Sequence, residues 1–369
     1  MISKSVFTSN NGCREIFFAG ESTPAKDFQS EALSLLEEYE KILAENSCSE
    51  ASEFLLRFHL SDIANQGHFL REKLKGRCSF ISVIGQAPAS HARLALTAWH
   101  IPGMKKEKLS GEAFKVSWKD YTAILFRQET AFSGSYRQMM EEFVSLQDLL
   151  HKENACVEEN TLRTWIYCKD VDNNYAGLVK ARNDFFDTVG LTKENHFIAS
   201  TGIAGECEDP SRIVKMDSLS YTGLAQEQIQ HLYALDFLSS TALYGVRFER
   251  GTRITFGDRS HYYISGTASI DREGQVLFLY DVEKQTERIM ENLAALLKEG
   301  GGDLPDIKLA TVYLRDPADV FIVKKVMEKH FPGTLPAVFL KAPVCRPAWL
   351  VEIECIGLNG NAGEFAPLI

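Results

Sequence analysis

The chain has 369 residues, of which 45% are hydrophobic and 11% aromatic, so it is long enough to form two globular domains. Its 40 basic and 50 acidic residues give a formal charge of −10, which argues against nucleic acid or an anionic membrane as the main partner. The 25 glycines and 11 prolines are too few for a low-complexity disordered chain. A local basic pocket for a small anion is still compatible with this charge.

The eight cysteines are widely spaced, and no two of them are closer than ten positions. This spacing lacks the paired cysteines of a zinc knuckle, and the cysteines are too sparse for a disulfide framework. The amino-terminal residues lack the continuous apolar stretch of a signal peptide, and no apolar run reaches the roughly 18 residues of a membrane span. We therefore expect a cytoplasmic protein with reduced thiols, no membrane contact and no metal site.

The first third of the chain alternates between helical and extended patterns. Residues 24–46 carry apolar residues mostly at three-to-four spacing, which predicts an amphipathic helix. Strand candidates follow at 80–88, 93–102 and 121–129, where β-branched and aromatic residues cluster between turn residues. The polar stretch 102–112 between the last two predicts an exposed hairpin loop.

The rest of the chain contains one order of elements twice: a long helix, a strand and a second helix. Apolar periodicity places these elements at 136–152, 161–171 and 174–190, and again at 281–299, 307–316 and 317–331. Both strands end in a Tyr-x-basic-Asp corner, at 167–170 and at 313–316. We interpret this repetition as two tandem copies of one α+β unit.

Upstream of these helices, segments 84–87 and 265–268 resemble each other, and we interpret them as equivalent strands of the two copies. The spacing from this strand to the corner is longer in the first copy, so we place an insertion near 89–135. The helices of such a unit pack on one face of its sheet. We expect a neighbouring subunit to cover the other face, because an apolar sheet face needs a second layer.

The carboxyl-terminal part of the chain resembles the RidA/YjgF family over about residues 248–358. The resemblance is carried by YYISGTASIDREGQ (262–275), by the Tyr-Leu-x-Asp corner and by the final VEIECIGL (351–358). That family consists of small trimeric proteins with a chorismate-mutase-like fold. The resemblance therefore implies a mixed sheet with helices on one face, and a homotrimer as an assembly.

A narrower resemblance covers more of the chain. Five segments occur in the order found in the chorismatase family: RTWIYCKDVDNNYAGLVKARNDFF (163–186), HFIASTGIAGE (196–206), YGVRFERG (244–251), ISGTASI (264–270) and VCRPAWLVEIE (344–354). Chorismatases have two RidA-like domains in one chain. They hydrolyse chorismate to pyruvate and either a dihydroxycyclohexadiene carboxylate or a hydroxybenzoate. The resemblance implies the same activity here, on a small anionic substrate and with no cofactor.

These resemblances imply an α+β fold of two tandem RidA-like domains, each a mixed sheet with helices packed on one face. We divide the chain into a helical extension (1–50), a divergent first domain (51–205), a linker (206–239) and a second domain (240–369).

Hydrolysis of an enol ether needs a carboxylic acid with a raised pKa and cationic anchors for the substrate carboxylates. Glu352 and Glu354 alternate with apolar residues along the expected last strand, so both point to one face of the sheet. A carboxyl group in a closed apolar cleft resists ionisation and can serve as the acid. The resemblance makes Glu352 the catalytic candidate, and Glu354 is the reserve.

The substrate-binding candidates surround this acid in the family motifs. Arg346 stands where the chain turns into the last strand, and its guanidinium fork suits a carboxylate. Cys345 has no adjacent base in the sequence, so we interpret it as pocket lining and not as a nucleophile. The other candidates are Arg250, Tyr244, Thr201, Gly202, Arg163 and Glu354.

Some of these assignments leave alternatives open. Arg163 is equally suited to a structural ion pair with Asp170 or Asp172, and Tyr244 to a buried structural position. Two other functions are also compatible with the sequence. One is an imine or enamine deaminase of the RidA kind, and the other is a non-catalytic member of the fold that binds a small molecule.

Overall fold

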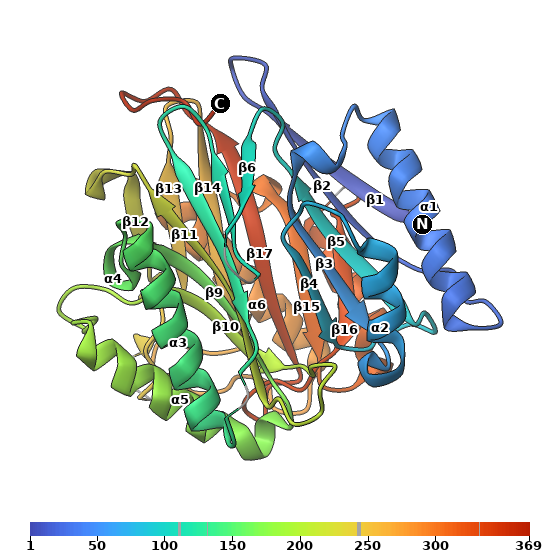
Figure 1. Cartoon of the computed structure of the whole chain (residues 1–369). Helices are drawn as coiled ribbons and strands as arrows, with labels where there is room; N and C mark the ends of the chain where they lie inside the picture. The colour runs from blue at the N-terminus through green and yellow to red at the C-terminus, as the bar shows by residue number, and fades with distance from the viewer. Residues whose placement is uncertain (110–111, 131, 242–244, 332) are drawn as a thin grey trace.

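The computed structural model describes the whole chain except residues 110–111, 131, 242–244 and 332. The described residues form three β-sheets with helices on their outer sides (Figure 1). Among them, no helix combines the length and the apolar character needed to cross a bilayer. The α+β class and the mixed sheets covered by helices on one face are confirmed, but there are three sheets instead of two.

The first sheet takes in the amino-terminal hundred residues. Its strands, in spatial order, are β1 (Ile2–Thr8), β2 (Arg14–Glu21), β5 (Leu94–His100), β3 (Glu53–Leu60) and β4 (Ile81–Gly85). Its outer face is covered by α1 (Phe28–Glu45) and α2 (Ile63–Leu74). The predicted helix at 24–46 is α1, and Asp27 caps it by accepting a hydrogen bond from the backbone of Ser30.

The second sheet follows directly along the chain. Its strands, in spatial order, are β10 (Ala199–Ala204), β9 (Thr161–Cys168), β11 (Val214–Thr222), β8 (Thr122–Gln128), β7 (Phe114–Ser117) and β6 (Lys105–Lys108). Its helices are α3 (Ser135–Lys152), the short α4 (Val157–Asn160) and α5 (Val171–Thr188). The stretch 102–112 was expected to be a loop, but it contains β6, an edge strand on which Lys105 and Lys108 are exposed.

The third sheet completes the chain. Its strands, in spatial order, are β12 (Ile229–Leu232), β13 (Gly251–Thr255), β14 (Arg259–Ala268), β17 (Val351–Gly360), β15 (Ile307–Leu314) and β16 (Ala337–Lys341). Its helices are α6 (Val282–Glu299) and α7 (Val320–His330).

All three sheets have the same topology. In each, a helix leads to a strand (β3, β9 or β15), and a second helix leads to a parallel neighbour of that strand (β4, β10 or β16). The last strand of each sheet (β5, β11 or β17) then inserts antiparallel beside the first of these two. The chain is therefore three copies of one unit.

The expected division into two copies was wrong because strands from different places in the unit were matched. Segment 84–87 begins in the last two residues of β4, which corresponds to β10 and β16 and not to β14, where 265–268 lies. Residues 89–135 are not an insertion, since they contain β5 of the first sheet and the first three strands of the second.

The expected domain boundaries change for the same reason. Residues 1–50 are not only a helical extension, because they supply β1 and β2 of the first sheet. Residues 206–239 are not a linker, since they contain β11, which lies between β9 and β8. The expected first domain, 51–205, begins inside the first sheet and ends inside the second.

The inner faces of the three sheets pack against one another in one shared core. Trp99 of the first sheet lies 6.2 Å, between ring centroids, from Tyr263 of the third. The hydroxyl of that tyrosine is 3.5 Å from the hydroxyl of Tyr221 in the second sheet. Figure 1 shows α1 and α2 on one flank and α3 and α5 on the opposite flank, with the sheets between them. The chain therefore covers with its own sheets the faces that we expected a second subunit to cover.

A buried ion pair crosses each of the three junctions between sheets. Arg259 binds Glu15 at 2.7 Å across the first and third sheets, and both side chains are fully buried. Arg57 binds Asp217 at 3.2 Å across the first and second sheets. Arg163 binds Glu354 at 2.7 Å across the second and third. Because a buried charge that loses its partner costs about 3–5 kcal/mol, these pairs favour one relative placement of the sheets.

Candidate active site between the second and third sheets

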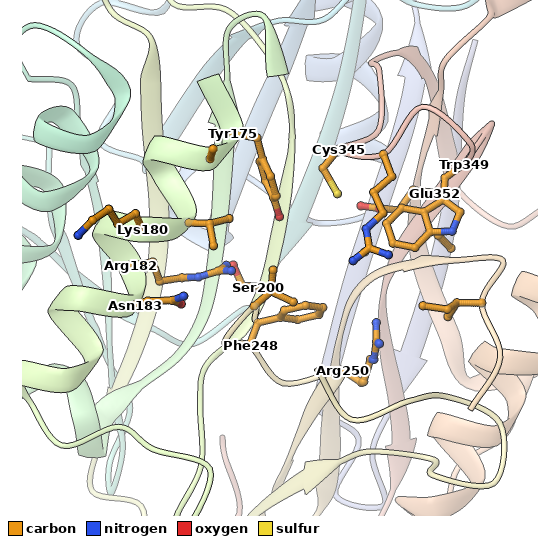
Figure 2. Close-up of a pocket in the computed structure, with 18 of the residues that line it drawn as sticks. Tyr175, Lys180, Arg182, Asn183, Ser200, Phe248, Arg250, Cys345, Trp349 and Glu352 are labelled. Atoms are coloured by element: carbon orange, nitrogen blue, oxygen red, sulfur yellow. The ribbon is translucent and has the colours of Figure 1, made fainter. Parts of the chain in front are cut away.

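A cavity of about 530 Å³ opens at the junction between the second and third sheets (Figure 2). Its volume lies in the range of small-molecule sites. Helix α5 and strand β10 form one wall, and β14, β17 and the segments before β13 and β17 form the other. The lining residues used below are Tyr175, Val179, Arg182, Ser200, Gly202, Phe248, Arg250, Gly266, Ile270, Cys345, Arg346, Trp349 and Glu352.

Glu352 is the carboxyl group in the wall of this cavity. It lies near the start of β17, paired with Tyr313 on one side and Ala268 on the other, and only 5% of it is exposed. Burial, reinforced by the negative charge of Glu354, raises the pKa of Glu352 to about 8, against the opposing charges of Arg250 and Arg163. Glu352 is therefore a protonated carboxylic acid at neutral pH.

Two arginines lie on the same side of the cavity as this acid. Arg250 is buried, donates a hydrogen bond to the carbonyl of Ser239 and has its guanidinium 5.2 Å from the ring centroid of Phe248. Burial lowers the pKa of Arg250 to about 10, so it still carries its charge at neutral pH. Arg346 lies with its guanidinium 4.9 Å from the ring centroid of Trp349. Together they form a cationic end next to Glu352.

Arg182 on α5 supplies a cation at the opposite end of the cavity (Figure 2). Its side chain is 2% exposed, and its Nε and Nη2 atoms have no hydrogen-bond partner among the residues that the structure describes. Burial lowers the pKa of Arg182. Our sequence analysis missed this residue. The signal was a charged side chain on the buried stripe of a helix, beside Leu178 and Phe185.

Tyr175 and Cys345 occupy the middle of the cavity. The ring of Tyr175 lies against Gly202, where a Cβ atom would be only 3.1 Å from it, so a glycine there leaves room for the ring. Burial raises the pKa of the Cys345 thiol to about 12, which keeps it protonated at neutral pH. This state suits the interpretation of Cys345 as pocket lining.

Three of the predicted binding residues do not line the cavity. Thr201, Arg163 and Glu354 form a buried cluster behind its wall. Arg163 pairs with Glu354 and not with Asp170 or Asp172, and Asp172 instead binds Arg315 at 3.0 Å. Tyr244, also predicted to bind substrate, lies outside the described residues.

Of these predicted residues, Glu354 shares strand β17 with Glu352, and the alternation of the strand predicts that both point to one face. The sequence pattern could not show which of these side chains line the cavity and which lie in the core. That difference depends on how the second and third sheets pack together.

Comparisons with known proteins support this architecture. The sequence profile of the family described as endoribonuclease L-PSP matches residues 255–358. A crystal structure of a chorismatase superposes on 96% of this chain and 99% of its own, with a TM-score of 0.66 and 17% identity. The chain has the chorismatase fold.

Single-unit relatives align with about a third of the chain. RidA from an Antarctic Psychrobacter covers 35% of this chain and 98% of its own, at 23% identity and a TM-score of 0.29. Yeast Mmf1 covers 36% of this chain and 98% of its own, at 16% identity and a TM-score of 0.31. The resemblance to chorismatases and RidA-like proteins that we noted in the sequence is confirmed for the fold by the chorismatase structure and the L-PSP profile.

Within the chorismatase fold of this chain, three equivalent positions face the junctions, and only one holds an acid. Glu352 lies opposite Tyr313 of β15. The equivalent residue of the second sheet, opposite Tyr167 of β9, is Lys215, and that of the first sheet, opposite His59 of β3, is Ala95. Lys215 donates to the carbonyl of Val83 at 2.7 Å. Of these three equivalent positions, only the one in the third sheet therefore carries a carboxyl group.

Proposed function

We propose that this site hydrolyses the enol ether of a chorismate-like dianion and releases pyruvate. The observation that carries the proposal is Glu352, a carboxylic acid kept protonated at neutral pH in a cavity with cationic ends. A protonated acid is what the reaction needs first, because an enol ether becomes reactive to water only after its methylene carbon takes up a proton. The chorismatase fold and the family motifs support the same substrate class.

The reaction begins with transfer of the Glu352 proton to the methylene carbon of the enolpyruvyl group. The π electrons of the double bond form the new C–H bond, and the ether carbon becomes an oxocarbenium ion. The carboxylate left on Glu352 stabilises this cation. Water adds to the ether carbon and returns a proton to Glu352. The resulting hemiketal then collapses: its hydroxyl loses a proton as the ketone of pyruvate forms, and the oxygen attached to the ring takes up a proton as its bond to that carbon breaks. The products are pyruvate and a dihydroxycyclohexadiene carboxylate, which becomes a hydroxybenzoate if it then loses water.

The two cationic ends of the cavity match the two carboxylates of such a substrate. We assign one carboxylate to Arg182 and the other to Arg250 and Arg346, because a guanidinium fork binds a carboxylate with two parallel hydrogen bonds. Between these ends the walls are apolar, with Val179 on the wall formed by α5 and Phe248, Ile270 and Trp349 on the opposite wall. Such walls limit the water around Glu352 and so help to keep its proton in place.

The proposal is tested by incubating the purified protein with chorismate and following pyruvate with a coupled lactate dehydrogenase assay. We expect pyruvate release by the parent and a loss of about 10²–10⁴-fold in Glu352→Gln, since the amide keeps the shape but has no acidic proton. Glu291→Gln, an exposed residue on the outer side of α6, is the matched control and keeps the parental rate. A parent that releases no pyruvate contradicts the proposal.

An imine deaminase of the RidA kind is the second candidate. It is favoured by one observation: the segment that matches the L-PSP family contains both Arg346 and Glu352, a carboxylate-binding group beside an acid. Hydrolysis of a 2-imino acid, generated in place by an amino acid oxidase, distinguishes the two functions. Ammonia release without activity on chorismate supports the deaminase, and binding of chorismate without turnover of either substrate indicates a non-catalytic binding protein.

A further inference from the structure

Behind the cavity wall, Arg163, Thr201 and Glu354 form a hydrogen-bonded cluster that links the second and third sheets close to Glu352. Arg163 of β9 donates through Nη2 to Glu354 of β17 at 2.7 Å and to the hydroxyl of Thr201 on β10 at 2.6 Å. The same hydroxyl accepts a hydrogen bond from the backbone N–H of Gly266 at 2.9 Å. Gly266 lies directly beneath the carboxyl group of Glu352, since a Cβ atom built on it would be 2.7 Å from Glu352 Cδ.

The same cluster places buried charges next to the strand that carries Glu352. Glu354 is two residues from Glu352 on the same face of β17, which places the Cα atoms of the two residues about 7 Å apart along the strand. Besides Arg163, a second guanidinium approaches Glu354, that of Arg57 at 3.9 Å. Arg57 belongs to the first sheet, so all three sheets meet at this cluster although only two of them line the cavity.

We propose that the Arg163–Glu354 pair positions the catalytic acid: it fixes the Gly266 backbone beneath Glu352 through Thr201, and it places the carboxylate of a buried ion pair beside Glu352. The proposal rests on the function proposed above, in which Glu352 is the proton donor. Arg163, Glu354 and Thr201 are positioning residues in this scheme, because none of them lines the cavity. The earlier assignment of these residues to substrate binding is replaced by this one.

The negative charge of Glu354 favours the protonated form of Glu352, and the surrounding cations oppose it. Several elements contribute titratable or charged groups near Glu352, and these groups influence its pKa together with Glu354. These groups are Arg163 on β9, Tyr175 and Arg182 on α5, Arg250 before β13, Tyr313 on β15, and Cys345, Arg346 and Glu354 around β17.

The first test is the variant Glu354→Gln, read out by the titration of Glu352 itself. The amide can still accept a hydrogen bond from Arg163, but it no longer repels the ionised form of Glu352. The guanidinium groups of Arg163 and Arg57 also lose their counter-charge and attract that ionised form. Both effects lower the pKa of Glu352. We expect a fall of about one unit or more. Isotope-edited infrared spectra of the full chain between pH 5 and 10 measure it, with Glu352→Gln identifying the band. The readout needs no turnover, so it decides this proposal even if chorismate is not the substrate.

The matched control is Glu15→Gln at the junction of the first and third sheets. It removes a buried carboxylate from Arg259, as Glu354→Gln does from Arg163, but it lies in a different junction. We expect it to lower thermal stability and leave the titration of Glu352 where it is. If Glu352 titrates in Glu354→Gln at the same pH as in the parent, the electrostatic part of the proposal is overturned. It is also overturned if Glu15→Gln changes the pKa of Glu352 as much as Glu354→Gln does.

The second variant tests the backbone half and serves if Glu354→Gln does not fold. Thr201→Val keeps the volume but removes the hydroxyl between Arg163 and Gly266, whereas Thr201→Ser retains it. With the substrate established by the assays above, we expect Thr201→Val to lower kcat about tenfold with little change in KM, and Thr201→Ser to restore kcat. Equal kcat values in the parent and Thr201→Val overturn the positioning role.

Discussion

The carboxyl group of Glu352 lies against the backbone of Gly266, at the register shift of β14, and occupies the space that a side chain at residue 266 would take. A Cβ atom on Gly266 would overlap Glu352 and would also come within 3.1 Å of Thr201. The family motif ISGTASI therefore carries its glycine for a steric reason: the acid needs the place of the missing side chain.

Gly266→Ala is predicted to displace the acid without removing it. We expect kcat for pyruvate release to fall by about 10²-fold with a smaller change in KM, because misplacing a catalytic group by about 1 Å has this order of effect. Steady-state kinetics with chorismate measure it. Gly360→Ala on the same sheet has no atom within 4 Å of the added carbon and is the control. A parental kcat in Gly266→Ala would show that the contact does not matter for catalysis.

Arg182 is predicted to anchor one substrate carboxylate. Arg182→Met removes the charge, and Arg182→Lys keeps it but loses the planar fork. We expect kcat/KM to fall by about 10–100-fold in the methionine variant, the effect of losing a hydrogen bond to a charged group, and less in the lysine variant. Calorimetric titration with chorismate and steady-state kinetics measure the change. Arg137→Lys, on the exposed side of α3, should behave like the parent, and so would Arg182→Met if the anchor lies elsewhere.

The sequence contains a sign of the amino-terminal copy of the repeat, which our sequence analysis did not recognise. The corners ending in Asp170 and Asp316 have a counterpart in FHLSD, which ends in Asp62. All three aspartates begin the helical segment after their strand, and two of them, Asp62 and Asp316, accept a hydrogen bond from the backbone two or three residues on. In the first copy His59 replaces the tyrosine of the corner and Ser61 replaces its basic residue, and these two differences hid the repeat.

The site could be predicted only where its residues lie close together in the sequence. Motif and strand alternation identified Glu352 and its neighbours Arg346 and Cys345, which are close together in the sequence. Arg182 comes from a helix of another sheet, and its role depends on which junction contains the cavity. A sequence that repeats one unit three times offers three such junctions, and only the packing of the sheets shows that Glu352 and Arg182 meet at the cavity between the second and third.

The junction between the first and third sheets is predicted to depend on Arg259 and Glu15. Arg259→Met leaves Glu15 buried with His261 and Trp99 as its remaining hydrogen-bond partners. We expect a loss of about 3–5 kcal/mol in the free energy of unfolding, measured by chemical denaturation. Asp184→Asn breaks the exposed pair with Lys180 and should cost less than about 1 kcal/mol. Equal losses in the two variants would show that burial does not govern the strength of these pairs.

The pH dependence of this junction has a definite sign. Glu15 is buried, but the charges and hydrogen bonds of His261 and Arg259 outweigh its desolvation and lower its pKa. A carboxylate with a lowered pKa stabilises the fold above its unfolded value and loses that contribution as the pH falls. The stability difference between the parent and Arg259→Met should therefore shrink on acidification below about pH 4, and a difference that grows there would contradict the assignment.

The acid itself is predicted to destabilise the protein at alkaline pH. The pKa of Glu352 is raised by burial and by Glu354 to about 8, above its unfolded value, so the folded protein binds this proton more tightly than the unfolded chain does. Its contribution to stability is therefore fully present below the unfolded pKa and is lost progressively as the pH rises toward 8.

Glu352→Gln removes this titration, because an amide stays neutral at every pH. We expect the Tm of Glu352→Gln to exceed that of the parent by several degrees at pH 9, and the two to agree closely at pH 4, where both side chains are neutral. Differential scanning calorimetry across this range measures the change, and Glu291→Gln is the exposed control. The basic limb of the pH–rate profile of the parent should fall through the same pH range, since the acid must be protonated to act. If Glu352→Gln gains no stability at pH 9, Glu352 is ionised without cost in the folded protein and cannot be the proton donor at neutral pH.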